Sequence, residues 1–272
     1  MARQRNPVLM GFLMVLTIAA PSTLCETQQV WKSAEIEALA AKTRKPVPLH
    51  SGAGYAIHGK SLEKAERSAS GERVDQVLWV RRGAGRLSLG SPPRHSEIAA
   101  GDLIRIPRRT PYSIEPQGGR LNLIAVRLQP LAVGGNAPPG IRPARGEMGD
   151  TLKKAEIDAT IARTQANAPL HAQDNFTVNY VLFKGRVGPW ESHTGCADIY
   201  LVQTGSGVIQ LGGSIENARE DSPGEPRGTG MTGSRESEVG AGDLLVIPRG
   251  VAHHMNPKSM PLAYLLIKVW SH

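Results

Sequence analysis

Short apolar runs of four to eight residues, separated by glycine and proline, recur along most of the chain. They lie at 77–80, 86–89, 103–106 and 121–128, and again at 199–202, 208–211, 244–247 and 262–269. Branched and aromatic residues are frequent in these runs, as is typical of strands. Their regular spacing predicts an all-β fold of the sandwich or barrel kind.

Two segments depart from this strand pattern and place apolar residues at helical spacing. The first contains Ile36, Leu39 and Ala40, and the second contains Ile157 and Ile161. Residues three and four apart lie on one face of a helix. The sequence therefore predicts a short helix before each set of strands.

The two sets of strands are related by an internal repeat. The sequence AEIEA at 34–38 recurs as AEIDA at 155–159, and PLH at 48–50 recurs at 169–171, both at an offset of 121. Two independent matches at one offset predict two copies of one module. We assign an N-terminal barrel to 30–130, a Pro/Gly-rich linker to 131–150 and a C-terminal barrel to 151–272.

The second copy carries an insertion. VRRGAG at 80–85 matches VQTGSG at 202–207 at an offset of 122, but GDLIRIPR at 101–108 matches GDLLVIPR at 242–249 at an offset of 141. The offset rises by 19, and the extra residues lie within 213–240, a segment rich in glycine, serine and charge that contains no apolar run. We interpret them as a flexible loop, with a lid as the alternative.

The first 25 residues have the features of an export signal. Arg3 and Arg5 precede the apolar stretch at 8–20, and small residues before Glu26 suit cleavage there. The stretch is short of the roughly 20 apolar residues that span a bilayer. We expect a secreted or periplasmic protein without stable membrane insertion after cleavage, the alternative being an uncleaved anchor.

Charge and cysteine content narrow the function classes. The net charge of +8 is spread along the chain without a Lys/Arg block, which argues against a nucleic-acid partner. Cleavage would remove Cys25 and leave Cys196 as a lone thiol, so no disulfide framework can form. We interpret Cys196 as a core or turn residue, because no motif supports a nucleophile there.

Candidate ligands gather in two stretches of the second copy. Glu191 and His193 point to one face of a strand, because side chains alternate with period two. A turn after His193 could return Asp198 to the same point, and His253 follows a Pro-x-Gly segment. The alternative is that the two histidines are polar residues at the mouth of a barrel, with no metal.

The spacing of these residues resembles the paired motifs of the cupin superfamily. The first stretch reads Gly185, five residues, Glu191-x-His193, four residues, Asp198, six residues, Gly205, and the second reads Gly242, five residues, Pro248-x-Gly250, two residues, His253. It departs from the family pattern in Glu191, where a histidine is usual, and in Asp198, where a glutamate is usual. The resemblance implies two tandem cupin-like, double-stranded β-helix (jelly-roll) barrels, each preceded by a short helix.

The same resemblance implies a metal site. His193, Asp198 and His253 would be ligands, and Glu191 a fourth ligand or a base beside the metal. Imidazole and carboxylate donors suit one divalent ion of Fe, Mn, Zn or Ni. Glu191 or His254 would move protons, although adjacency to His253 on an extended chain turns His254 toward the other face.

The repeat offsets provide an internal comparison. They align the four candidate residues with Ala69, Gly71, Gln76 and Tyr112 of the first copy, none of which is a usual metal ligand. The first copy is thus expected to keep the scaffold without the site. Its arginines could line an anion-binding mouth, or could simply be solvated; they are Arg81, Arg82, Arg105, Arg108 and Arg109.

We therefore expect an exported bicupin with one divalent metal, acting on a small oxygenated organic substrate by oxidation, decarboxylation or isomerisation. The alternative is a non-catalytic cupin protein that binds a small molecule or a sugar. Uncovered sheet edges favour pairing, which makes a homodimer compatible with either function.

Overall fold

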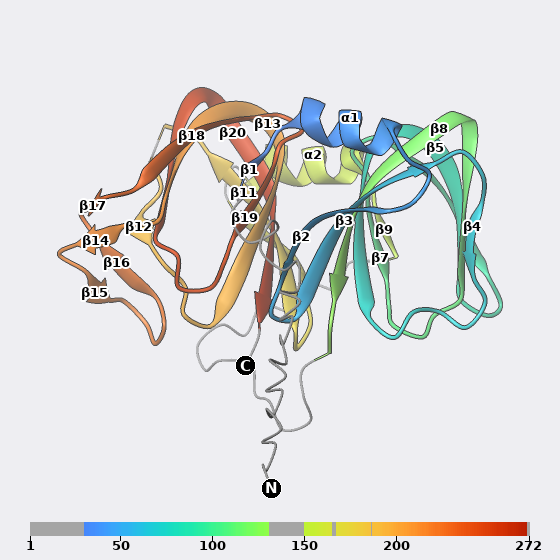
Figure 1. Cartoon of the computed structure of the whole chain (residues 1–272), viewed down its shortest axis with the longest axis horizontal. Coiled ribbons are helices and arrows are strands. Elements are labelled where there is room, and N and C mark those ends of the chain that lie inside the picture. Colours follow the sequence, from blue (N-terminus) through green and yellow to red (C-terminus); the bar gives the residue numbers. More distant parts are fainter. Residues whose placement is uncertain (1–29, 131–149, 165–166, 186, 271–272) are drawn as a thin grey trace, which may run out of the picture.

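Two antiparallel sheets, one of eight strands and one of ten, curl into barrels that lie side by side (Figure 1). This computed structural model describes residues 30–130, 150–164, 167–185 and 187–270. The architecture is an all-β jelly roll, which confirms the expected fold class. The expected signal at 1–25, and all of the expected linker except residue 150, lie outside the described residues. Across the described ranges, no helix has both the length and the apolar character needed to cross a membrane.

The eight-stranded sheet is built almost wholly from the first half of the chain. Its strands are β2 (Val47–Gly52), β3 (Tyr55–Leu62), β4 (Glu66–Ser68), β5 (Asp75–Leu89), β6 (Arg94–Ala99), β7 (Leu103–Ile106), β8 (Tyr112–Leu128) and β9 (Thr151–Leu152). Helix α1 (Ser33–Ala41) precedes β2 and buries Ile36 and Ala40.

The ten-stranded sheet follows helix α2 (Lys154–Thr164). Its strands are β1 (Val30–Trp31), β10 (Ala168–Ala172), β11 (Phe176–Phe183), β12 (Trp190–Glu191), β13 (Cys196–Leu211), β15 (Arg219–Glu220), β16 (Pro226–Gly228), β18 (Arg235–Gly240), β19 (Leu244–Ile247) and β20 (His253–Trp270). A separate hairpin, β14 (Ser214–Glu216) with β17 (Gly230–Thr232), projects from its outer side (Figure 1).

Apolar runs that the sequence separates are joined in long strands. The runs at 77–80 and 86–89 both lie in β5, and those at 199–202 and 208–211 both lie in β13. In β5 the two runs meet at a bulge at Gly83, where φ is 87°, and in β13 they meet at a bulge at Gly205, where φ is 80°. The pairing register shifts near both glycines. Such a bulge bends a strand without ending it, so one strand serves both ends of its barrel.

The central strands of both barrels are buried on both faces. In β5, Val77 and Trp79 belong to a core between the two barrels, whereas Leu78 and Val80 belong to the core inside the first barrel. The residues of β13 divide in the same way between the shared core and the interior of the second barrel. Alternation with period two therefore supplies both an interior and an inter-barrel surface.

Each barrel receives a strand from the segment that precedes the other barrel, and caps the helix that follows this strand. Strand β1 pairs with β19 of the second barrel, and β9 pairs with β7 of the first. Asp243 Oδ1 accepts the N–H of Ser33 at 2.8 Å, and Asp102 Oδ1 accepts the N–H of Lys154 at 2.9 Å, so each carboxylate caps the helix whose strand it receives. The Gly-Asp sequence that recurs at 101 and 242 therefore joins the barrels.

The interpretation of residues 213–240 as a flexible loop is wrong. The segment forms the β14–β17 hairpin and the strands β15, β16 and β18, and β16 pairs with β12 beside the candidate ligands. An exposed hairpin is held by backbone hydrogen bonds and needs no apolar run, which is why hydrophobic patterning missed it.

Arg81 does not line an anion-binding mouth. Its Nη2 donates to Ser33 Oγ at 2.5 Å and to the carbonyl of Gly242 at 3.0 Å. The guanidinium thus ties the start of α1 to the second barrel, which explains why it is buried although it is charged.

The helix cap supplied by Asp243 yields a stability prediction. Asp243→Ala should lower the free energy of unfolding by about 2 kcal/mol, because the change leaves the partly buried N–H groups of Ser33 and Gly240 without their acceptor. Chemical denaturation measures this. Glu97→Ala, which removes an exposed pair with Arg86, is the matched control and should cost less than about 1 kcal/mol. Equal losses in the two variants would show that the cap does not join the barrels.

Candidate metal centre

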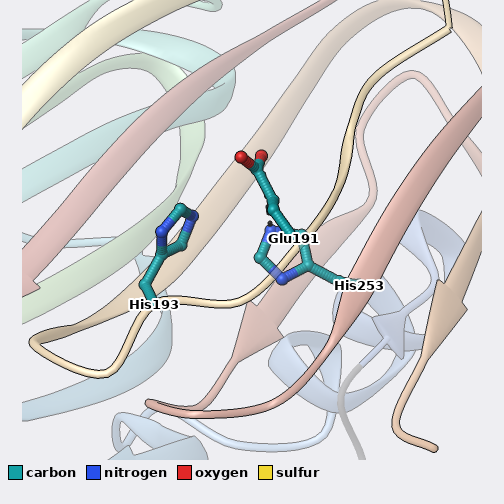
Figure 2. Close-up of side chains that lie close together, drawn as sticks. All are labelled: Glu191, His193 and His253. Atoms are coloured by element: carbon teal, nitrogen blue, oxygen red, sulfur yellow. Dashed lines mark ion pairs between the residues drawn. The ribbon is translucent and has the colours of Figure 1, made fainter. Parts of the chain in front are cut away.

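Three side chains that could hold a metal ion converge in the second barrel: Glu191, His193 and His253. One ligand atom from each lies within 4.8 Å of the others. Glu191 ends β12 and is paired with His253, which begins β20. Figure 2 shows the carboxylate and the two imidazoles gathered around a common space.

Local backbone geometry explains this convergence. Glu191 and His193 are two residues apart on extended chain, so their side chains leave on the same side. Gly250, with φ of 77°, turns the chain before His253. Its N–H donates to the carbonyl of His193 at 2.7 Å, which fixes the two histidine segments against each other.

His253 is buried with one ring nitrogen free. Its Nδ1 lies 3.1 Å from the carbonyl of Val251, and its Nε2 has no hydrogen-bond partner, the carboxylate of Glu191 being 3.8 Å away. Burial lowers the pKa of His253, and the neighbouring Asp198 opposes that effect only in part. A neutral imidazole whose Nδ1–H is bound to a carbonyl presents the Nε2 lone pair, which is the form that ligates metals.

His193 is held between two carboxylates. Its Nδ1 lies 2.7 Å from Oε2 of Glu225, and its Nε2 lies 3.4 Å from Oδ2 of Asp198. Burial of the imidazole by itself lowers the pKa, but hydrogen bonds to Asp198 and Glu225 outweigh burial and raise the pKa of His193 to about 9. In the absence of a cation the ring is therefore protonated at neutral pH.

Asp198 lies beside the three converging residues rather than among them. It is 1% exposed, and its carboxylate is 3.5 Å from both Lys268 Nζ and the hydroxyl of Tyr200. Burial would raise the pKa of Asp198, but Lys268 and His193 hold it well below the usual range. Aspartate is one methylene shorter than the glutamate usual in the motif, and here it bonds to these neighbours.

His254 is separated from the other candidates. Its ring stacks on Trp190 with centroids 4.3 Å apart, and its Nδ1 lies 3.3 Å from the carbonyl of Pro189. It lines a different cavity, together with residues of β13 and of the β14–β17 hairpin. Adjacent residues of a strand face opposite sides, so His254 cannot serve the space that His253 faces.

Two charged residues of the insertion reach the site and were missed from the sequence. Glu225 contacts His193, and Arg227 Nε donates to Glu191 Oε2 at 3.2 Å. Both come from the segment that runs antiparallel to β12. Within the sequence, only the high density of charge in 213–240 distinguished this segment, and it gave no indication of contact.

Glu191 and His193 line a cavity of about 670 Å³, and His253 lies behind them. Its polar part includes Glu191, His193 and Tyr200, and its apolar part comes from β11, β20 and the chain before β12. The other lining residues are Asn167, Val181, Leu182, Phe183, Lys184, Val187, Gly188, Pro189, Asp198, Glu225, Arg227, Tyr264, Leu266 and Lys268. Such a mixture of apolar wall and convergent polar groups is typical of a small-molecule site.

Cys196 is the free thiol expected from the sequence, and it is buried at 1% exposure. Burial, reinforced by Asp198, raises the pKa of this thiol. A thiol held in its neutral form is a poor nucleophile, which agrees with its interpretation as a core residue.

The first barrel has different residues at the corresponding positions. Tyr112 pairs with Leu89 as His253 pairs with Leu211, in agreement with the offsets. Two sequence-based matches are wrong, however. The residue that pairs with Tyr112, as Glu191 pairs with His253, is Ser68 and not Ala69. The residue whose carbonyl accepts the N–H of the following turn, as the carbonyl of His193 does, is Glu72 and not Gly71. The sequence match missed these positions because the spacing between them differs in the two halves.

The structural comparison thus places one acidic residue, Glu72, at the position of His193, and Glu72 forms an ion pair with Arg127 at 3.2 Å. Among the described residues, the second barrel holds the only group of three or more potential ligands close enough for one ion.

No protein-family model and no curated protein sequence matches the chain. Solved structures do match. A cupin 2 conserved barrel domain protein from Leptotrichia buccalis aligns with a TM-score of 0.57 and 18% identity, over 91% of this chain and 100% of that one. Salicylate 1,2-dioxygenase from Pseudaminobacter salicylatoxidans aligns with a TM-score of 0.63 and 11% identity, over 88% of this chain and 83% of that one.

A mutant of the same dioxygenase, crystallised in complex with gentisate, aligns with a TM-score of 0.62 and 11% identity, over 88% of this chain and 81% of that one. The chain has the cupin-barrel fold that its motifs implied. At these identities the similarity extends to the fold alone.

The raised pKa of His193 predicts how the metal-free protein responds to pH. The folded pKa of about 9 exceeds the unfolded value of about 6.5, so protonated His193 stabilises the fold fully below pH 6.5. This contribution is lost as the pH rises through about 9. Denaturation of the wild type and of His193→Gln in chelator should show a stability difference that shrinks between pH 6.5 and 9.5. A difference that stays constant over this range would contradict the assignment.

Proposed function

We propose that this chain is a bicupin whose second barrel binds one divalent transition metal and acts on a small anionic organic molecule. The observation that carries the proposal is the convergence of Glu191, His193 and His253 within 4.8 Å beside a cavity of about 670 Å³. The unpartnered Nε2 of buried His253 supports it, because an unsatisfied buried polar atom is costly unless a ligand engages it.

The donor set suits a first-row transition metal. Two imidazoles and one carboxylate form the combination found in non-haem iron sites, and they also suit Mn, Zn and Ni. Asp198 adds negative charge within 3.4 Å of His193 Nε2, as a neighbour or as a further ligand. When bound, the cation would supply Lewis-acid polarisation of substrate oxygens.

The charges of the cavity favour an anionic substrate. With the His193 ring neutral, as a bound ion requires, three carboxylates and three cationic side chains line it and their formal charges cancel. A divalent ion would make the loaded cavity positive, which attracts an anion. Lys268 and Arg227 would orient its oxygen atoms, and the apolar wall around Val181 and Leu266 would exclude water from the reacting end.

Oxidation, decarboxylation and isomerisation all fit this chemistry. In each of them the Glu191 oxygen that does not bind the ion would accept or return a proton, because the carboxylate lies beside His253 at the cavity. Oxidation is the first to test, since one structural neighbour is named as a dioxygenase.

We further propose that the two barrels arose from one repeated module and that the first has no metal site. Corresponding strands of the two sheets pair in the same register: Gln76 lies opposite Arg127 as Asp198 lies opposite Lys268. We also propose that the chain is exported. Expression in a secreting host should then give a mature protein whose intact mass corresponds to a chain that begins at Glu26.

Metal analysis tests the proposed site. Purified wild-type protein should contain about one equivalent of a transition metal, and His193→Ala or His253→Ala should lose nearly all of it, because each removes a donor atom. His254→Ala, which alters the neighbouring cavity, is the control and should retain the metal. A wild type without stoichiometric metal, or ligand variants that keep it, would disprove the proposal.

Turnover separates an enzyme from a binding protein. The metal-loaded wild type should consume a small hydroxy or keto carboxylate, assayed with and without oxygen, and Glu191→Gln should reduce the rate at least tenfold because it cannot accept the proton. Calorimetric binding of such acids without any consumption would instead support the non-catalytic alternative.

A further inference from the structure

We infer that Glu225, from the insertion at 213–240, is a positioning residue of the metal centre that fixes the orientation and tautomer of His193. The inference rests on the proposed metal site. It gives the insertion a role in metal binding that the two cupin motifs do not contain.

The geometry at His193 supports this role. Glu225 Oε2 lies 2.7 Å from Nδ1, on the opposite side of the ring from Nε2. Nδ1 meets no hydrogen-bond acceptor in good geometry, and Glu225 is the carboxylate at ion-pair distance from it. A neutral imidazole carries one N–H and a carboxylate can only accept it, so this contact would place the proton on Nδ1. The lone pair is then on Nε2, where a metal ligand needs it, and the contact also fixes the angle of the ring.

The backbone holds Glu225 in this place from both sides. The N–H of Thr194 donates to the carbonyl of Gly224 at 2.9 Å, and the N–H of Ser192 donates to the carbonyl of Pro226 at 3.1 Å. These bonds flank Glu225 on the insertion and His193 on the opposite segment. The two side chains are therefore placed opposite each other by main-chain pairing.

Burial distinguishes Glu225 from the rest of the insertion. Among its residues, all of which the structure describes, Glu225 is the only charged one that is buried, at 8% exposure. Burying a carboxylate is costly unless it is paired, and His193 is the charged partner that it contacts. Polar residues elsewhere in the insertion remain in solvent, as expected for an exposed hairpin.

Titration of the chelator-treated full chain with Co²⁺ tests the inference. Glu225→Ala should weaken Co²⁺ affinity by about 10- to 100-fold and alter the visible absorption spectrum of the bound ion. Glu225→Gln should lose less, since its amide oxygen can still accept the Nδ1–H although it lacks the charge. Glu236→Gln, in the same insertion but hydrogen-bonded to Gln210, is the matched control and should bind as the wild type does.

The outcomes distinguish this inference from the proposed function. If the wild type binds no Co²⁺, both fail. If the wild type binds and the Glu225 variants have the same affinity and spectrum, the inference alone fails. A drop in melting temperature of Glu225→Ala with an unchanged Co²⁺ spectrum would also overturn it, because the contact would then only support the fold. If Glu225→Ala does not fold, the Co²⁺ affinity and spectrum of Glu225→Gln, compared with those of Glu236→Gln, decide the question.

Discussion

The antiparallel pairing of β13 with β20 is the constraint on which the second barrel depends. It sets Asp198 opposite Lys268 at one end and Leu211 opposite His253 at the other. Because side chains alternate along both strands, this register decides which residues face the cavity and which face the other barrel. A slip of one residue would turn His253 out of the site and His254 into it. The bulge at Gly205 lets the strand bend while keeping the register on both sides.

Charged groups inside this barrel are arranged so that each has a partner. Asp198 lies near Lys268, His193 near Glu225, and Glu191 near Arg227. Unpaired buried charges would cost several kcal/mol each, so these contacts allow the barrel to fold before a cation arrives. Metal binding would replace the proton on His193 and engage the free nitrogen of His253. The same side chains would thus form ion pairs in the metal-free protein and hold the ion in the metal-bound protein.

The first barrel is a structural partner of the second, whatever its own chemistry. Its strands contribute to a shared apolar core, and Asp102 and Asp243 cap the helices that cross between the barrels. Losing the first barrel would expose the outer faces of β11, β13 and β20. Packing against the barrel that holds the candidate metal site is therefore a physical reason to retain the first barrel, independent of any chemistry of its own.

Much of this arrangement follows from local pattern. Alternating apolar runs predicted the strands, recurrent blocks predicted the two halves, and the resemblance to the cupin motifs implied that His253 meets Glu191 and His193. The shared side of Glu191 and His193 is a property of neighbouring residues, which period two fixes without knowledge of the rest of the chain. Only the tertiary structure decided that Asp198 bonds to Lys268 and that Glu225 reaches His193. Such contacts join segments whose separation in sequence carries no periodic signal, so they depend on how the strands pack and how far each side chain extends.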